Sequence, residues 1–526
     1  MEHASSKVRP ALLVATWVLV GYPAEILADE YPTTDTVRSQ AGPEEPVPDA
    51  TSESSDFDPL LDARPAAPPP SQVITNQSAP SARGADSMSS PPVTLPPAPP
   101  SSPAPPAPAS SPLTWYGVTL YGVIDLGVAY LSHGAPLSQT YGPSVPYIIQ
   151  SYSNRSMTSL ASNGLSQSKL GLSGVEPLGG LDLKAVFKLE TGFQPTSGRL
   201  TDGPKSLVDN NGRATGDKAT SGDSARAGQP FQGAAFAGVA STRLGTLTFG
   251  RQPSLMADDL MRYDPQLQSQ AFSPIGYSGT SGGLGATEDK VLDRSVKYGL
   301  ALGPVRLAGL YQFGDRDFMP GRSQSLDLGV DVAGLSADLL LGRVYGAVSA
   351  SSLTAAQNAA APGTLAATAS DNTGYALMLR YAAAWIKLYG GYERMVYTNP
   401  KDPLPNGTVT IGGYVLSSVN NTAFTIRKVL QYTWTGVRVS LSRFLDVSGA
   451  YYYFRQNSYN ANGCSDNSAG SCSGSYHDVS FVAAVKLSSW CDVYTGVNHS
   501  RAVDGMAAGF ISDRNWTSMT GLRLSF

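Results

Sequence analysis

The sequence is poor in the residues on which metal centres, disulfide scaffolds and charged surfaces depend. Its 526 residues include only three cysteines and four histidines, and Asp, Glu, Lys and Arg together make up 15% of the chain. After the N-terminus, no run approaches the roughly 18 consecutive apolar residues that a membrane-spanning helix needs. These shortages argue against a Cys/His metal centre and a helical membrane protein, and nothing in the sequence indicates a metal, a cofactor or a nucleic acid.

The first 28 residues have the layout of a secretory signal peptide. Lys7 and Arg9 supply a positive start, residues 11–20 an apolar core, and Ala28 the end of a plausible cleavage site. An apolar N-terminal helix is the alternative interpretation. Export would place the chain in an oxidising compartment, where cysteines can pair.

Residues 29–112 form a different kind of segment, which holds 21 of the 39 prolines. It has too little apolar mass and too few N–H donors to fold, so we expect a disordered or polyproline-like linker. Residues 1–112 carry 13 acids and 5 bases, which leaves 28 acids and 32 bases in 113–526. The linker is therefore acidic, and it acts either as an unselective spacer or as a tether.

From residue 113 onward, apolar side chains recur at every second position. In TLYGVIDLGVAYL and in the closing TSMTGLRLSF, apolar residues occupy one face and polar residues share the other. The alternation runs over about ten residues at a time and recurs along the chain, which predicts an all-β, transmembrane antiparallel barrel with lipid outside and water inside, although a soluble all-β array also allows it. We count sixteen strands, near 116–131, 166–175, 180–193, 231–241, 244–251, 292–302, 304–314, 323–334, 335–349, 373–384, 385–398, 422–442, 445–456, 475–487, 489–500 and 514–526.

The predicted connections alternate between short turns and long loops, as in bacterial outer-membrane barrels. Because the strand count is even, both chain ends lie on the short-turn, periplasmic side. The linker would then hang in the periplasm, where its length and composition raise the hypothesis of a contact with peptidoglycan or a periplasmic partner.

Several segments resemble the Gram-negative general-diffusion porins, particularly the β-proteobacterial type. The matching pieces, in order, are LYGVID, SKLGLSGVEPLG, LETGF, FAGV, LGTLTFGRQ, RSVKY and the closing Phe526. The resemblance covers about 114–526. It implies a homotrimer in outer-membrane lipid, a third long loop folded into the lumen, and passive diffusion of small hydrophilic solutes. It also implies that Phe526 is the signal read by the barrel-assembly machinery.

In such porins, acids on the inward loop face bases on the barrel wall, and these charges together with the pore radius set what passes. The resemblance places the loop at about 252–291 and gives its acids as Asp258, Asp259, Asp264, Glu288 and Asp289. The corresponding wall bases are Lys169, Arg251, Arg294, Lys297 and Arg306, and Asp125 is a lumen acid. Each of these charges also fits an ordinary solvated lumen residue.

The register of three of these bases is open. Lys297 is the inward residue if Arg294 is not, and alternation points Arg251 outward unless the chain bends after Gly250. Two basic positions of the family are Val123 and Gly233 here, so the basic wall is thinner than usual. With an excess of four bases over 113–526, we predict a weak preference for anions.

Three further hypotheses concern other residues. Cys464 and Cys472 flank a Ser/Asn/Gly-rich loop that a disulfide would close. His499 and Ser500 raise the alternative of an outer-membrane hydrolase, but adjacent strand residues point to opposite faces. A substrate-specific outer-membrane channel is a closer alternative to a general-diffusion porin.

Overall fold

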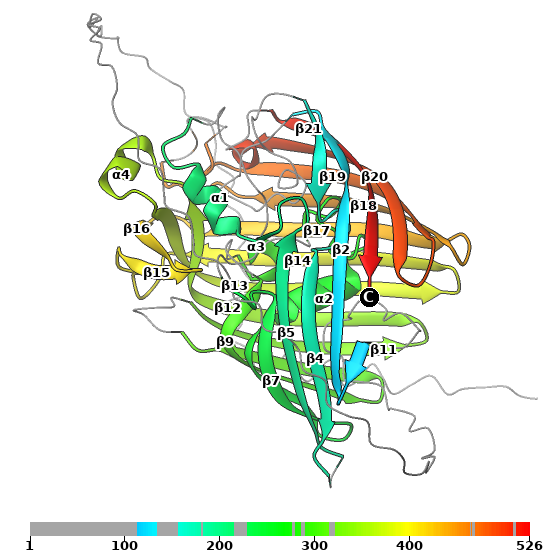
Figure 1. Cartoon of the computed structure of the whole chain (residues 1–526). Helices are drawn as coiled ribbons and strands as arrows, with labels where there is room; N and C mark the ends of the chain where they lie inside the picture. The colour runs from blue at the N-terminus through cyan, green and yellow to red at the C-terminus, as the bar shows by residue number, and fades with distance from the viewer. Residues whose placement is uncertain are drawn as a thin grey trace, which may run out of the picture. The chain divides into compact units, whose positions relative to one another are not determined.

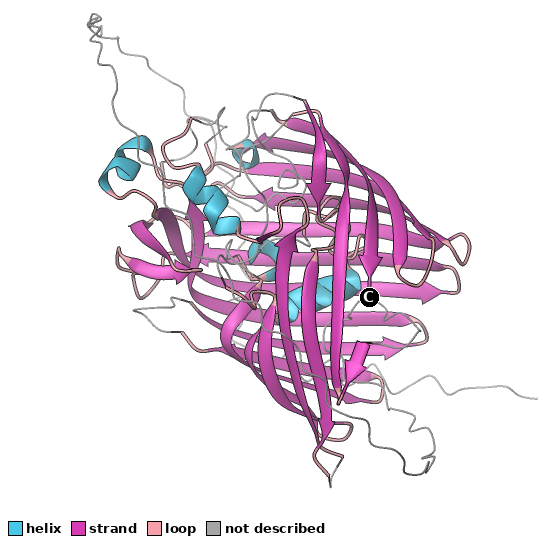
Figure 2. Cartoon of the chain, viewed as in Figure 1, coloured by secondary structure: helices cyan, strands magenta, loops and turns pink. Residues whose placement is uncertain are grey.

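The computed structural model describes residues 113–133, 156–179, 182–214, 229–275, 279–285, 290–314, 321–462, 464, 469–508 and 512–526. All described residues belong to the second of the chain's two units, residues 91–526. The predicted signal peptide and linker lie outside the described residues. Strands dominate the second unit (Figures 1 and 2).

Sixteen antiparallel strands close into a barrel, which confirms the predicted fold class. In chain order the ring consists of β2 (Val118–Leu131), β4 (Lys169–Pro177), β5 (Lys184–Gln194), β7 (Ala234–Ser241), β8 (Gly245–Pro253), β9 (Val291–Leu302), β10 (Val305–Gln312), β11 (Arg322–Val332), β12 (Leu335–Ser351), β13 (Leu365–Ala383), β14 (Ile386–Thr398), β17 (Lys428–Ser440), β18 (Leu445–Gln456), β19 (Gly474–Lys486), β20 (Cys491–Asp504) and β21 (Arg514–Ser525). Each strand pairs with the next, and β21 returns to pair with β2. Closure leaves no open edge in the ring, as a bilayer requires.

Five short strands and several short helices lie outside this ring. They are β1 (Leu113–Trp115), β3 (Met157–Ser162), β6 (Arg199–Leu200), β15 (Thr408–Ile411), β16 (Tyr414–Asn420), α1 (Gly203–Asp209), α2 (Leu255–Tyr263), α3 (Gly279–Gly282), α4 (Ala355–Ala360) and η5 (Gly505–Ala507). Within the described residues, no helix is both long and apolar enough to cross a membrane.

The last strand shows how the alternation works. Leu522 and Leu524 of β21 are exposed. Thr517 and Met519, which occupy alternate positions on the other face of the same strand, are buried. Exposed leucines also mark alternate positions of β11, at Leu326 and Leu328. A belt of exposed large apolar side chains fits a lipid environment and excludes the soluble alternative.

Turn chemistry fixes the short connections. In the two-residue turn between β11 and β12, Ala333 and Gly334 have φ values of 49° and 85°. Two positive φ values define a type I′ turn, whose twist matches that of the flanking strands. The predicted start of the second strand, residue 335, matches the observed one, and the predicted end of the first strand, residue 334, lies two residues beyond the observed end.

The seam between the first and last strands involves the final residue. Phe526 N donates to Gly122 O at 3.1 Å, and Gly122 N donates to Phe526 O at 2.9 Å. A Cβ built on Gly122 would lie 2.4 Å from Phe526 Cζ, so the ring covers a gap that only glycine leaves. The chain thus ends on an aromatic residue that packs onto the first barrel strand.

Two strand boundaries differ from the sequence prediction by six residues or more. The strand predicted at 373–384 is β13 and starts earlier, at Leu365, because its extension pairs with β12 and with β16 in the long-loop region. The strand predicted at 422–442 is β17 and starts later, at Lys428. Both errors lie at the long-loop end, where lipid does not impose the alternation on which the prediction rests.

Candidate functional site: a constriction formed by loop 254–290

The long connection between β8 and β9 folds into the barrel, and its helix α2 lies inside the ring of strands (Figure 1). The Ser254 side chain caps α2 by accepting from Ala257 N at 3.0 Å. Leu255, Met256, Leu260 and Tyr263 form the buried face of the helix. This face shares one apolar cluster with inward residues of the wall, including Leu310, Leu340 and Met378. Burial of that face holds the loop against β10 to β14.

The segment after α2 is tied by directed hydrogen bonds to β17, β18 and β19, the strands that continue the wall beyond β14. Trp434 Nε1 donates to Tyr263 O at 3.0 Å. Gln266 Nε2 donates to Ser480 Oγ at 3.0 Å, and Ser448 Oγ donates to Gln266 Oε1 at 2.7 Å. The loop therefore follows the barrel wall from β10 round to β19.

Beneath this segment the inward face of the barrel is aromatic. Tyr432, Trp434, Tyr452 and Phe454 are at most 1% exposed. Sequence reasoning assigned apolar faces to the lipid, and on β17 and β18 the larger apolar side chains are instead those that pack against the loop. The aromatic residues at alternate positions of QYTW and at every position of YYYF were the available signal.

One face of α2 remains partly open, and it carries Asp258, Met261 and Arg262. Asp258 Oδ2 lies 2.7 Å from Lys297 Nζ, so the structure brings together an expected loop acid and an expected wall base. Lys297, rather than Arg294, is the inward residue of β9.

On the wall, two lysines converge on one carboxylate. Lys169 Nζ and Lys188 Nζ lie 3.1 and 3.2 Å from Glu190 Oε2, and Tyr121 OH donates to the same oxygen at 2.9 Å. The lysine side chains are 22% and 25% exposed, so part of each charge faces the open lumen. Sequence reasoning named Lys169 but missed Lys188 and Glu190, although both lie on the polar face of their strand.

The last expected base, Arg306, belongs to a larger charge network. Its Nη2 donates to both Asp338 oxygens at 2.8 and 2.9 Å and to Tyr263 OH at 3.2 Å. Arg306 Nη1 also pairs with Asp331. Arg262 Nη1 approaches Asp338 Oδ2 at 3.7 Å.

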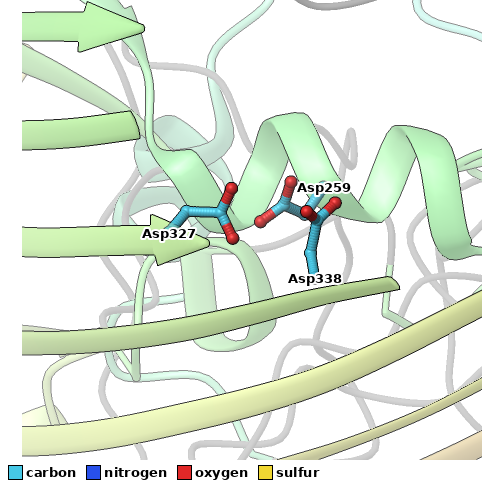
Figure 3. A group of neighbouring side chains, drawn as sticks. All are labelled: Asp259, Asp327 and Asp338. Carbon is cyan, nitrogen blue, oxygen red and sulfur yellow. The ribbon is translucent and has the colours of Figure 1, made fainter. Parts of the chain in front are cut away.

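Asp259 lies beside this network and is buried. Its burial and the nearby carboxylates of Asp327 and Asp338 raise its pKa well above the usual value. Sequence reasoning listed Asp259 as a pore acid, but its side chain turns toward the wall rather than the open lumen (Figure 3).

Two of the expected acids, Asp264 and Asp125, accept hydrogen bonds from backbone N–H groups and do not line the pore. Asp264 is fully buried and accepts from Tyr452 OH, Gln266 N and Gln268 N at 2.6, 3.1 and 2.7 Å. Burial raises its pKa, and the hydrogen bond from Tyr452 opposes that rise. A carboxylate so enclosed cannot face permeating ions, so Asp264 differs from the expectation for a constriction acid.

Asp125 faces inward but is likewise 0% exposed. It accepts from Tyr494 OH at 2.6 Å and from the backbone N–H groups of Gly164, Leu165 and Ser166 at 3.2, 2.8 and 2.9 Å. It thereby fixes the excursion between β3 and β4, both of which pair with β2.

Arg251 and Arg294 occupy an irregular stretch of β8 and β9. The pairing register shifts after Gly250, whose φ is 129°, and Arg294 has a φ of 48°. Arg251 Nη1 pairs with Asp293 Oδ1 at 2.6 Å, and its Nε donates to Gln232 O at 2.7 Å. The bend does redirect Arg251, but toward a buried ion pair rather than the pore. Glu288 and Asp289 lie outside the described residues.

The structure also places the two cysteines and the His–Ser pair that the sequence singled out. A disulfide joins Cys464 and Cys472, whose Cα atoms are 5.4 Å apart. His499 stacks on Trp516 with ring centroids 4.3 Å apart, while Ser500 is buried on the other face of β20. These two residues do not form a nucleophile–base pair.

A closed, lipid-facing β-barrel whose inward loop leaves a charged passage defines a membrane channel. The chain belongs to the Gram-negative porin family, whose model matches residues 101–505. It is therefore an outer-membrane porin that forms a passive channel.

A solved porin structure supports this fold. The anion-selective porin from Comamonas acidovorans matches with a TM-score of 0.52 and 18% identity, over 78% of this chain and 99% of that one. A loop-L8 deletion mutant of OmpT from Vibrio cholerae gives 0.49 and 13%, over 78% and 99%. Salmonella typhi OmpF in complex with daunomycin gives 0.46 and 13%, over 78% and 97%. No curated protein matches this chain.

Proposed function

We propose that this porin passes small hydrophilic solutes by general diffusion and weakly prefers anions. The observation that carries the preference is the pairing of two partly exposed lysines, Lys169 and Lys188, with the single acid Glu190. Arg380 and Arg438 lie on inward positions, and neither forms an ion pair with an acid within the described part of the chain. The Comamonas acidovorans porin is described as anion-selective, which agrees in direction with these charges.

Reversal potentials in planar bilayers test the preference. With full-length protein in a potassium chloride gradient, the sign of the zero-current potential should indicate that chloride is more permeant than potassium. The preference should weaken as salt rises, because charges facing water are screened. A potential of the opposite sign would contradict the proposal.

A substrate-specific channel is the second candidate, and the packing of the long loops favours it. Residues of connections 195–233, 352–364 and 399–427 contact one another, for example through Tyr414 OH to Asp202 Oδ2 at 3.2 Å and Ser352 Oγ to Leu207 O at 2.7 Å. Such a cover at the long-loop end narrows access to the lumen. Liposome swelling with graded sugars and amino acids separates the two candidates, since general diffusion sorts solutes of equal charge by size alone.

The family resemblance supports a homotrimer, with Phe526 as the signal for the barrel-assembly machinery. For the N-terminal segment, we propose a periplasmic tether that contacts peptidoglycan or a periplasmic partner. The length and acidic, proline-rich composition of 29–112 support this role. Deleting 29–112 should reduce co-sedimentation of the porin with the cell wall and leave its conductance unchanged. Unaltered sedimentation and assembly would contradict the tether.

A further inference from the structure

Loop 254–290 docks a carboxylate against two carboxylates of the barrel wall. Asp259 comes from α2, Asp327 from β11 and Asp338 from β12, and Figure 3 shows the three side chains converging. One oxygen from each lies within 4.8 Å of the others. Their exposed fractions are 8%, 6% and 1%, so little water screens their repulsion.

Two of the oxygens have no hydrogen-bond partner. Asp259 Oδ2 and Asp327 Oδ1 are both buried and receive no donor from the described residues. Asp338 differs, because both of its oxygens accept from Arg306 Nη2. A buried carboxylate oxygen without a donor costs free energy unless a cation, a proton or water satisfies it.

The local charges do not balance. The network contains Asp259, Asp327, Asp331 and Asp338, against the two bases Arg262 and Arg306, which leaves a formal charge of −2. Arg306 pairs with Asp331 and Asp338, and neither Arg306 nor Arg262 donates a hydrogen bond to Asp259 Oδ2 or Asp327 Oδ1. One divalent cation would bring the charge to zero.

We propose that Asp259, Asp327 and Asp338 bind one divalent cation, with the chemistry of calcium, between the constriction loop and the barrel wall. Calcium takes six to eight oxygen ligands at about 2.3–2.6 Å, so opposite ligands lie about 4.6–5.2 Å apart. One oxygen of each carboxylate lies within 4.8 Å of the others, so a single ion can contact all three, and calcium accepts an irregular set of oxygen ligands more readily than magnesium, which requires a near-ideal octahedron. Water from the lumen supplies the remaining ligands.

The site would cross-link three elements. Asp259 lies between the apolar residues that seat α2, so a cation on it pulls the helix onto β11 and β12. The bound ion therefore fixes the wall-facing side of α2, and with it the position of Asp258 and Arg262 on the open side. Calcium would set the geometry of the constriction without blocking it.

Calcium binding is measured on full-length porin refolded without lipopolysaccharide, because that lipid binds calcium itself. After chelation, isothermal titration should reveal one saturable calcium site per protomer, with affinity in the range of extracellular modules, about 0.1–1 mM. The double variant Asp259→Asn/Asp327→Asn should bind at least about tenfold more weakly. Asp209→Asn, which removes an exposed acid from α1, is the matched control and should bind as the wild type does.

Terbium luminescence locates the ion without removing a ligand. Tyr263 OH accepts from Arg306 Nη2, which contacts Asp338, so tyrosine-excited terbium emission should fall several-fold in Tyr263→Phe. That variant should keep its calcium stoichiometry. Absence of a saturable calcium site in the wild type, unchanged binding in the double variant, or unchanged emission in Tyr263→Phe would each overturn the proposal. None of these results bears on the anion preference, which is measured separately by reversal potentials.

Discussion

At the scale of single residues, Glu190 controls how much of the charge on Lys169 and Lys188 reaches the lumen. It pairs with both lysines at 3.1 and 3.2 Å. Glu190→Gln should therefore raise the chloride preference, and Lys169→Gln should lower it. A unit charge about 7 Å from a permeating ion in water contributes about 0.6 kcal/mol, which is about a threefold change in the permeability ratio. Reversal potentials measure both variants.

The two substitutions are expected to shift the reversal potential in opposite directions, which a general change in the pore would not do. Lys205→Gln is the control, because Lys205 pairs with Asp209 in α1, where both side chains are about half exposed. It removes one base without touching the convergent pair on the wall. If Glu190→Gln and Lys169→Gln shifted the reversal potential in the same direction, the field of this cluster would not govern selectivity.

The role of a single residue could be predicted from the sequence only where the alternation of apolar and polar positions determines which way its side chain points. The inward direction of Lys169 follows from the outward Leu170 and Leu172 beside it. Arg251 could not be placed, because a register shift after Gly250 redirects it toward Asp293. Asp264 and Asp259 could not be placed either, since their surroundings come from β11, β12 and β18, far away in the chain.

At the scale of elements, the constriction loop depends on a few polar anchors. Trp434 Nε1 donates to Tyr263 O at the end of α2, in a fully buried setting. Trp434→Phe keeps most of the apolar packing but leaves that carbonyl without its donor, which costs about 1–3 kcal/mol. We expect a looser loop, seen as higher open-channel noise in single-channel recordings.

Trp490→Phe provides the comparison for this prediction. Trp490 lies in the short connection between β19 and β20 and is 46% exposed. Trp490→Phe makes the same chemical change as Trp434→Phe, but at a position away from the constriction loop. Equal noise in the two variants, or none above wild type in Trp434→Phe, would show that the apolar cluster alone holds α2.

The strands themselves were the most predictable elements. Lipid imposes a period of two on every strand that crosses the bilayer, so all sixteen could be found from their sequence alone. The aromatic inner face of β17 and β18 could not be inferred, because the loop that covers Tyr432 and Tyr452 arrives from another part of the chain. Periodicity identifies a strand, but what each face contacts depends on tertiary structure.

At the scale of the whole molecule, the barrel closes where β2 meets β21, and glycine is required at that seam. Gly127 pairs with Gly521, and a Cβ on Gly127 would lie 2.3 Å from Thr520 O and 2.7 Å from Gly521 Cα. Both contacts are backbone atoms, which cannot rotate away as a side chain would. Any larger residue must push the first and last strands apart.

Gly127→Ala should therefore weaken closure of the entire ring, by about 1–3 kcal/mol for an overpacked site. Urea unfolding of refolded protein in lipid vesicles measures the loss. Gly299→Ala is the matched control, because a Cβ on that β9 glycine meets no atom within 4 Å. Equal unfolding midpoints for the two variants would mean that β2 and β21 accommodate the added methyl group without loss of stability. A loss of stability in Gly127→Ala alone would show that the barrel depends on the contact between β2 and β21, the two ring strands that lie farthest apart in the sequence.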